Sequence, residues 1–209
     1  KAESIEDAGE YYVINTTKGK IQTRHIINAT ESYTALLHPS FTDKLYPKQT
    51  QGFFAKDGPP NMKEKVAMGG THGWFGRVPG TGGYIAGSDG KRVADNKAGV
   101  IDPSRFITKF LVGHVHEYFG ATPSNVEREW TCTAGFTDDE YPIVGTIDNK
   151  RQYIIGGMCG SGSGVHFNAS KSVVCKISNI ENTDYYPEQY FSPNRILDPN
   201  SHNWPELEG

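Results

Sequence analysis

The stretch "GGMCGSGSGVHFNASKSVVC", residues 156–175, places five glycines within nine residues directly before a helix-like run. The preceding "YIIGG" is typical of a buried strand, and "VHFNASKSVVCKI" has the apolar spacing of an amphipathic helix. A glycine-rich turn before a helix presents unpaired N–H groups at the positive end of the helix dipole. We therefore expect a site for an anion or a polar oxygen here. A flexible linker is the alternative, which the strand–turn–helix context disfavours.

Upstream of this turn, the chain is dominated by strand-like segments. "EYYVINTTKGKIQTRHIINAT", residues 10–30, alternates and turns at Lys18 and Gly19, which predicts a hairpin followed by a buried strand. "SYTALL" predicts a short helix ending at His38. Four strand-like segments separated by glycine and proline turns follow between residues 44 and 90.

The clearest helix is "DPSRFITKFLVGHVHEYFG", residues 102–120, with Asp102 or Ser104 near its start and Gly120 as its stop. More strands lead from residue 125 to the glycine-rich turn, and the proline-rich, aromatic segment 181–209 predicts an extended tail on the surface. This order of elements predicts an α+β fold with strands in the majority. It lacks the alternating pattern of a mononucleotide-binding fold.

Composition excludes several classes of partner. The 209 residues carry a net charge of −3 without a basic stripe, so we expect no nucleic acid. No apolar run approaches the roughly 20 residues of a membrane span. The three cysteines are widely spaced and resemble neither a disulfide framework nor a zinc site, so no metal is expected. The opening residues contain no methionine and enter a strand at once, as in a piece of a longer protein.

Familiar catalytic motifs are absent from the sequence. Neither G-x-G-x-x-G, nor a P-loop, nor the nucleophile elbow G-x-S-x-G fits any glycine cluster. His114 and His116 lie two residues apart on a helix, while His72 and His166 lie near glycine turns, and a structural or solvated role is favoured for each. The "TDDE" run, residues 137–140, is more typical of a solvated turn than of an acid/base pair. We assign no catalytic residue.

Two separated motifs nevertheless indicate a family. "WTCTAGFTDDEYPIVG" follows the pattern W-x-x-x-x-x-x-T-x-D-x-x-P-x-x-G, and "GGMCGSG" begins eleven residues after its last glycine. Together with "GKIQTRHIINAT", they resemble the C-terminal half of the D-amino-acid oxidase, glycine oxidase and sarcosine oxidase family of flavoproteins, over about residues 10–180. The resemblance implies FAD as the cofactor and an amine or amino-acid-like small molecule as the substrate. It also implies an intracellular location, cytoplasmic or peroxisomal.

The resemblance implies specific roles along the chain. The glycine-rich turn would lie beside the pyrimidine edge of the flavin, where backbone N–H groups stabilise the negative charge of the reduced ring. The implied cofactor-binding residues are Asn28, Ala29, Thr30, Gly157, Met158, Cys159, Gly160, Ser161 and Gly162. Trp74, Arg77 and Tyr84 would line the substrate pocket. Residues 1–40 and 134–180 would belong to the FAD-binding domain, 41–133 to a β-rich substrate lobe with the long helix, and 181–209 to the tail.

Three departures from the family pattern shape these expectations. The Rossmann motif is missing, so we expect this piece alone to bind FAD weakly or not at all, to be inactive, and to need an N-terminal segment of the same protein. Ala134 stands where glycine oxidase-like members have a carboxylate-binding arginine. Cys132 stands where some members tether the flavin; the alternative is a small buried residue. A second hypothesis is a non-catalytic module that binds a ligand or partner.

Overall fold

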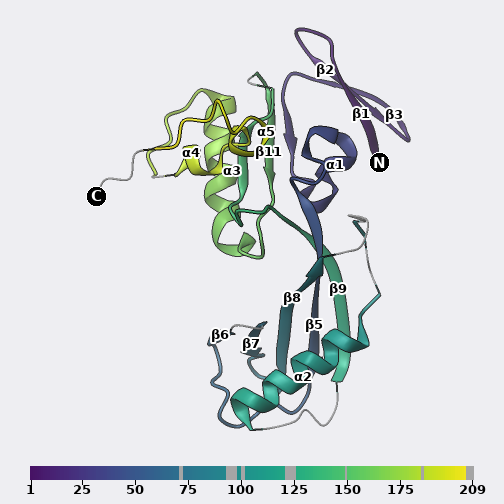
Figure 1. The fold of residues 1–209 in the computed structure, drawn as a ribbon, viewed down its shortest axis with the longest axis vertical. Helices are drawn as coiled ribbons and strands as arrows, with labels where there is room; N and C mark the ends of the chain where they lie inside the picture. Colours follow the sequence, from purple (N-terminus) through teal and green to yellow (C-terminus); the bar gives the residue numbers. More distant parts are fainter. Residues whose placement is uncertain are drawn as a thin grey trace. The chain divides into compact units, whose positions relative to one another are not determined.

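The chain folds into two compact units, unit 1 comprising Lys1–Pro47 and Ala134–Gly209, and unit 2 comprising Lys48–Thr133 (Figure 1). The structure is a computed structural model. It describes residues 1–70, 73–92, 98–99, 102–120, 126–148, 150–184 and 186–205.

Unit 2 is built on a five-stranded sheet and one long helix. The sheet has the order β6-β7-β8-β5-β9, and the pairs β6–β7, β7–β8 and β5–β8 are antiparallel. Helix α2 follows Ser104 and ends at Gly120, which has the left-handed φ of 67° expected of a glycine stop. The bounds are β5 (Tyr46–Ala55), β6 (Ala67–Gly70), β7 (Gly73–Arg77), β8 (Tyr84–Arg92), β9 (Val126–Phe136) and α2 (Arg105–Phe119).

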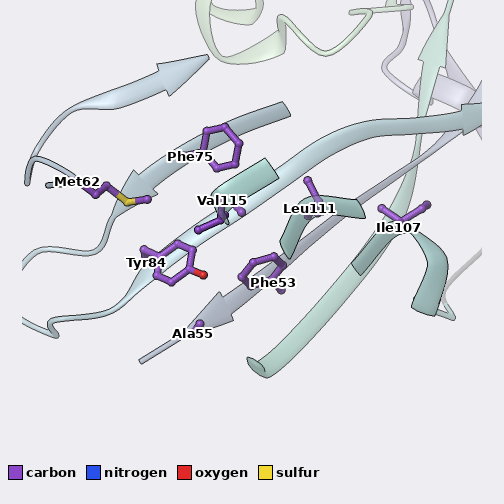
Figure 2. Packing of buried hydrophobic residues seen from close by; sticks show 9 residues of the cluster. Phe53, Ala55, Met62, Phe75, Tyr84, Ile107, Leu111 and Val115 are labelled. Atoms are coloured by element: carbon purple, nitrogen blue, oxygen red, sulfur yellow. The ribbon is translucent and has the colours of Figure 1, made fainter. Parts of the chain in front are cut away.

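The core of unit 2 lies between α2 and one face of this sheet. Ile107, Leu111 and Val115 recur every four residues and therefore share one face of α2. They form one buried cluster with Phe53 of β5 and Tyr84 of β8, which Figure 2 shows from close by. Because one face of α2 is buried against the sheet, its apolar residues recur at helical spacing, and this spacing predicts the helix from the sequence.

Unit 1 contains two small sheets. The first is the meander β1-β2-β3, whose second turn lies at Lys18 and Gly19 as expected. The second has the order β10-β11-β4, with β11 antiparallel to β10 and parallel to β4. The bounds are β1 (Ala2–Asp7), β2 (Tyr12–Thr16), β3 (Gly19–Thr23), β4 (Ile26–Asn28), β10 (Ile143–Thr146) and β11 (Gln152–Gly156).

Helices of unit 1 pack against the second sheet. Short helix α1 (Thr34–Leu37) follows β4 between two 3₁₀ turns, and α3 (Gly162–Ser178) follows the glycine-rich turn. Buried residues Ala169 and Val173 of α3 join Tyr153 and Ile155 of β11 in one apolar cluster, and the two elements run side by side in Figure 1. The strand–turn–helix unit expected at residues 153–177 is therefore confirmed.

The C-terminal segment differs from the extended tail that the sequence predicts. It contains two short helices, α4 (Glu188–Phe191) and α5 (Asn194–Leu197), and Arg195 is 3% exposed. The segment is not extended, because Arg195 binds Asp139 and the carbonyls of Tyr141 and Pro142 within unit 1. In the described part of the chain, no helix combines the length and apolar character that a bilayer span requires.

Candidate cofactor site

The turn between β11 and α3 is a run of left-handed backbone. Gly157, Cys159 and Gly160 have φ values of 60°, 50° and 82°. Ser161 precedes α3, makes no side-chain capping bond, and no acidic residue occupies the first helical turn. The first N–H groups of a helix have no partner within it, so the start of α3 presents partial positive charge.

Glu31 binds the amides on the inner side of this turn. Its Oε2 accepts a hydrogen bond of 2.5 Å from Gly157 N, and its Oε1 accepts bonds of 3.2 Å from Met158 N and 3.3 Å from Gly135 N. Three amides from two distant segments therefore converge on one carboxylate. The anion-binding character expected of the turn is present, and its ligand belongs to the chain itself.

The glycines around Glu31 leave room for this contact. A Cβ on Gly135 would lie 3.1 Å from Glu31 Oε2 and 3.0 Å from Leu45 Cδ1. A Cβ on Gly157 would lie 3.0 Å from Leu45 Cδ1 and 3.3 Å from Ile143 Cδ1, and its positive φ adds strain for any other residue. Packing inside unit 1 therefore explains these two glycines without a ligand.

Burial and hydrogen bonding have opposite effects on the pKa of Glu31. Desolvation raises the pKa of the Glu31 carboxyl above its usual value, against the three amide bonds and the nearby His166, which lower it. Both carboxylate oxygens face N–H donors, which is the arrangement that the ionised form satisfies. Sequence reasoning missed this residue, because a single glutamate after a strand carries no pattern.

A second set of contacts links the turn to the 137–141 segment. Cys159 N donates to Gly135 O at 3.1 Å, and Cys159 Sγ lies 3.1 Å from Gly157 O and 3.4 Å from Thr137 N. The Thr137 hydroxyl lies 2.8 Å from Asp139 Oδ1. Burial raises the pKa of the Cys159 thiol, so this cysteine is a structural hydrogen-bonding group and no activated nucleophile.

Asp139 lies in a bidentate ion pair with the C-terminal segment. Arg195 donates from Nε to Oδ2 at 2.7 Å and from Nη2 to Oδ1 at 3.0 Å, and it also binds Pro142 O at 2.9 Å and Tyr141 O at 2.6 Å. Although desolvation opposes it, bonding to Arg195 and Thr137 lowers the pKa of Asp139. The turn expected for "TDDE" is present, and Asp138, Asp139 and Glu140 are all exposed, but the Asp139 carboxylate is also bound by Arg195.

The residues that end β4 have internal partners too. Asn28 is 2% exposed; its Nδ2 donates to Tyr153 O at 2.8 Å, and its Oδ1 lies 2.9 Å from His38 Nε2. Ala29 is exposed, and the Thr30 hydroxyl lies 3.0 Å from the Thr34 hydroxyl. Asn28 thus joins β4 to β11 and to the segment after α1, and its assignment to a cofactor stays a prediction.

The predicted substrate residues belong to unit 2 and differ in exposure. The Trp74 indole, 41% exposed, lies against Gly87, and Arg77 Nη1 donates to Met62 O at 3.4 Å. Tyr84 is completely buried beside Phe53, and burial raises the pKa of its hydroxyl. In this conformation Tyr84 is a core residue without surface to offer a substrate.

Cys132 lies on β9 with its Sγ 3.0 Å from the Thr50 hydroxyl, and it is exposed. The alternative of a small buried residue is therefore wrong, while the flavin tether stays a prediction. Among the histidines, His72 lies outside the described residues, and His114 Nδ1 lies 3.0 Å from Glu117 Oε2 on α2. Across the described ranges, no three histidine, cysteine or acidic side chains are grouped to hold a metal ion.

Comparison with known proteins gives one family match. A family model described as DAO, FAD dependent oxidoreductase, matches residues 1–173. No curated protein sequence matches the chain.

Solved structures with a similar fold include three enzymes. Glycine oxidase from Geobacillus kaustophilus has a TM-score of 0.72 and 12% identity, over 92% of this chain and 52% of its own. L-proline dehydrogenase from P. horikoshii has a TM-score of 0.73 and 17% identity, over 93% and 53%. Iminodiacetate oxidase from Chelativorans sp. BNC1 has a TM-score of 0.70 and 12% identity, over 91% and 52%. The chain spans about half the length of these proteins, and the likeness concerns the fold.

Proposed function

Because this chain belongs to the DAO family of FAD-dependent oxidoreductases, we propose that it forms part of a flavoenzyme that oxidises a C–N bond of an amine or amino-acid-like substrate. Glycine, L-proline and iminodiacetate, which name the three enzymes of similar fold, all contain such a bond. When bound, FAD supplies the electron acceptor, and the protein binds and orients the reactants. This division of labour agrees with the absence of a catalytic motif in the sequence.

The observation that carries the proposal is the exposed, uncapped start of α3. Gly160, Ser161 and Ser163 are exposed, and Gly162 is half-buried. Their amides lie at the positive end of a 17-residue helix that has no acidic residue in its first turn. These residues fit the electron-rich pyrimidine edge of a flavin, and the amides of Gly160 and Gly162 would hold it. The Ser161 amide already donates to Met158 O at 2.8 Å, so Ser161 would lie at the site without giving its N–H.

The inner part of the turn fits a flavin less well. The amides of Gly157 and Met158 already donate to Glu31, so two of the expected cofactor contacts have another acceptor. We therefore assign the cofactor-binding role to the start of α3. We further propose that the 209-residue piece alone binds FAD weakly and does not turn over, because its family relatives are about twice as long.

The first experiment tests the activity in the full-length protein. Purified protein should carry bound flavin, and anaerobic addition of an amine or amino acid from a panel should bleach the flavin absorbance. A full-length protein without flavin would contradict the proposal and favour the non-catalytic binding module. Stoichiometric FAD on the 209-residue piece after purification would contradict the weak binding proposed for it.

The second experiment tests the site. Ser161→Asp places a carboxylate before α3, where it suits the helix as a cap but repels the flavin edge. We expect FAD to bind at least tenfold more weakly to this variant of the full-length protein. Ser170→Asp, at an exposed position later in the same helix, is the matched control and should bind FAD as the unmodified protein does. Equal FAD affinities for the two variants would contradict the proposed position of the flavin at the start of α3.

A further inference from the structure

Glu31 has a backbone conformation that a glutamate seldom adopts. Its φ of 49° lies in the left-handed region, where a side chain costs energy and glycine does not. Such a conformation persists when surrounding contacts hold it. The three amide bonds to the mostly buried carboxylate are contacts of this kind.

The bonds to Glu31 also limit what the turn can do. Each backbone N–H has one hydrogen, so an amide that donates to Glu31 is not free to donate fully to a ligand. The carboxylate further places a negative charge behind the turn, where it opposes a second anion on the same amides. His166, whose ring lies against Gly162, and the Cys159 thiol are the other titratable groups that act on this carboxylate or lie beside it.

We propose that Glu31 is a positioning residue that serves as the internal counter-anion of the glycine-rich turn. Its carboxylate ties Gly135 to Gly157 and Met158 and withdraws these amides from the flavin, which leaves the start of α3 to bind the cofactor. The binding of the three amides by Glu31 concerns the chain alone, whereas its effect on the flavin rests on the proposed function. Glu31 therefore makes the bound flavin harder to reduce than it would be if the amides of the turn were free to donate to it.

Glu140 provides a matched control for Glu31. It has the same residue type and a similar left-handed φ of 58°, but it is exposed. Replacing either glutamate with glycine relieves the same backbone strain, so a difference between the two variants reports on the carboxylate. Glu31→Gln and Glu140→Gln change the charge while they keep the size of the side chain.

The first test measures hydrogen exchange in the full-length protein, with or without flavin. The amides of Gly157 and Met158 should exchange at least tenfold faster in Glu31→Gly, relative to those of Ala169 and Val173 in α3 of the same sample. Glu31→Gln should fall between, because its carbonyl oxygen still accepts one set of bonds. Glu140→Gly and Glu140→Gln should leave the ratio unchanged. An unchanged ratio in both Glu31 variants overturns the proposal, whether or not the protein binds flavin.

The second test measures the reduction potential of the bound flavin. Glu31→Gly frees the two amide donors of the turn, Gly157 and Met158, together with that of Gly135, and removes a negative charge. The reduced flavin should therefore bind at least tenfold more tightly relative to the oxidised form. For a two-electron couple this is a rise of about 30 mV. The Glu140→Gly potential should equal that of the unmodified protein. A Glu31→Gly potential that stays equal or falls overturns the claim that Glu31 withdraws the amides from the flavin.

Discussion

Units 1 and 2 are stabilised by different kinds of interior. Among the described residues, the buried polar side chains of unit 1 are Asn28, Ser32, Thr34, Thr137, Ser172 and Arg195, whereas unit 2 has Gln51. The core of unit 2 is an apolar layer between a sheet and a helix. Unit 1 instead holds irregular, left-handed backbone in place with hydrogen bonds to side chains. The comparison teaches that the shape of unit 2 follows from apolar packing, whereas unit 1 combines its own apolar clusters with specific polar contacts.

The largest expected effect is the loss of packing in unit 2. Leu111 is completely buried between α2 and the sheet, so Leu111→Ala should lower the free energy of unfolding by about 3–5 kcal/mol, measured by urea denaturation. Phe106→Ala on the same helix is the control, since Phe106 is 78% exposed, and it should cost about 0.5 kcal/mol or less. Similar losses for the two variants would contradict the apolar core described here.

Unit 1 should respond most to the loss of Arg195. Arg195→Met leaves the Asp139 carboxylate and three backbone carbonyls without their donor, and we expect a loss of about 2 kcal/mol in the free energy of unfolding. Lys176→Met breaks the exposed pair with Glu188 and serves as the control, with about 0–1 kcal/mol expected. Equal losses would mean that burial of Arg195 adds nothing.

The stability of unit 1 should depend on acidic pH through the Asp139 carboxylate. The pKa of Asp139 is lowered in the folded state, so the contribution of this carboxylate to stability is present above its ordinary pKa of 3.8 and is lost as the pH falls through the lower, folded value. Asp139→Asn should therefore flatten the loss of stability below about pH 4 in unit 1, as followed by chemical denaturation at several pH values. The control Asp138→Asn, at an exposed neighbour, should keep the slope of the unmodified protein. A slope that is the same in both variants would argue against the ion pair.

The smallest effects should be the same in both units. Lys150→Met removes the exposed pair with Asp7 in unit 1, and Lys56→Met removes the exposed pair with Glu127 in unit 2. Each should leave the free energy of unfolding nearly unchanged, measured in urea at moderate salt, because exposed ion pairs are screened by solvent and salt. A clearly larger loss of unfolding free energy in one unit would mean that the two units also differ in how strongly surface ion pairs stabilise them.

Local patterns account for most of the elements of the fold. Apolar spacing predicts α2 and α3, and glycine and proline place the turns of the hairpin and of unit 2. These signals act over a few residues, so a single sequence displays them. The family motifs then add the expected cofactor and the position of the site, because their spacing reflects a shared fold.

Contacts between distant segments escape such reasoning. Glu31 and Gly157 are 126 residues apart, and Asp139 and Arg195 are 56 apart. Nothing near Glu31 in the sequence distinguishes it from a solvated glutamate, and a proline-rich segment around Arg195 favours an extended tail. Tyr84 differs, because an aromatic residue on a strand suits a pocket or a core equally; it is buried in this structure, and its substrate role stays a prediction.

The position of Arg195 has a practical consequence for shortened forms of this protein. The family match ends at residue 173, whereas Arg195 and the helix that carries it lie beyond that limit. A clone trimmed to the matched region would encode Asp139 without its guanidinium partner and would uncover the carbonyls of Tyr141 and Pro142. Crystallisation or screening of truncated material should therefore retain the sequence through at least Leu197.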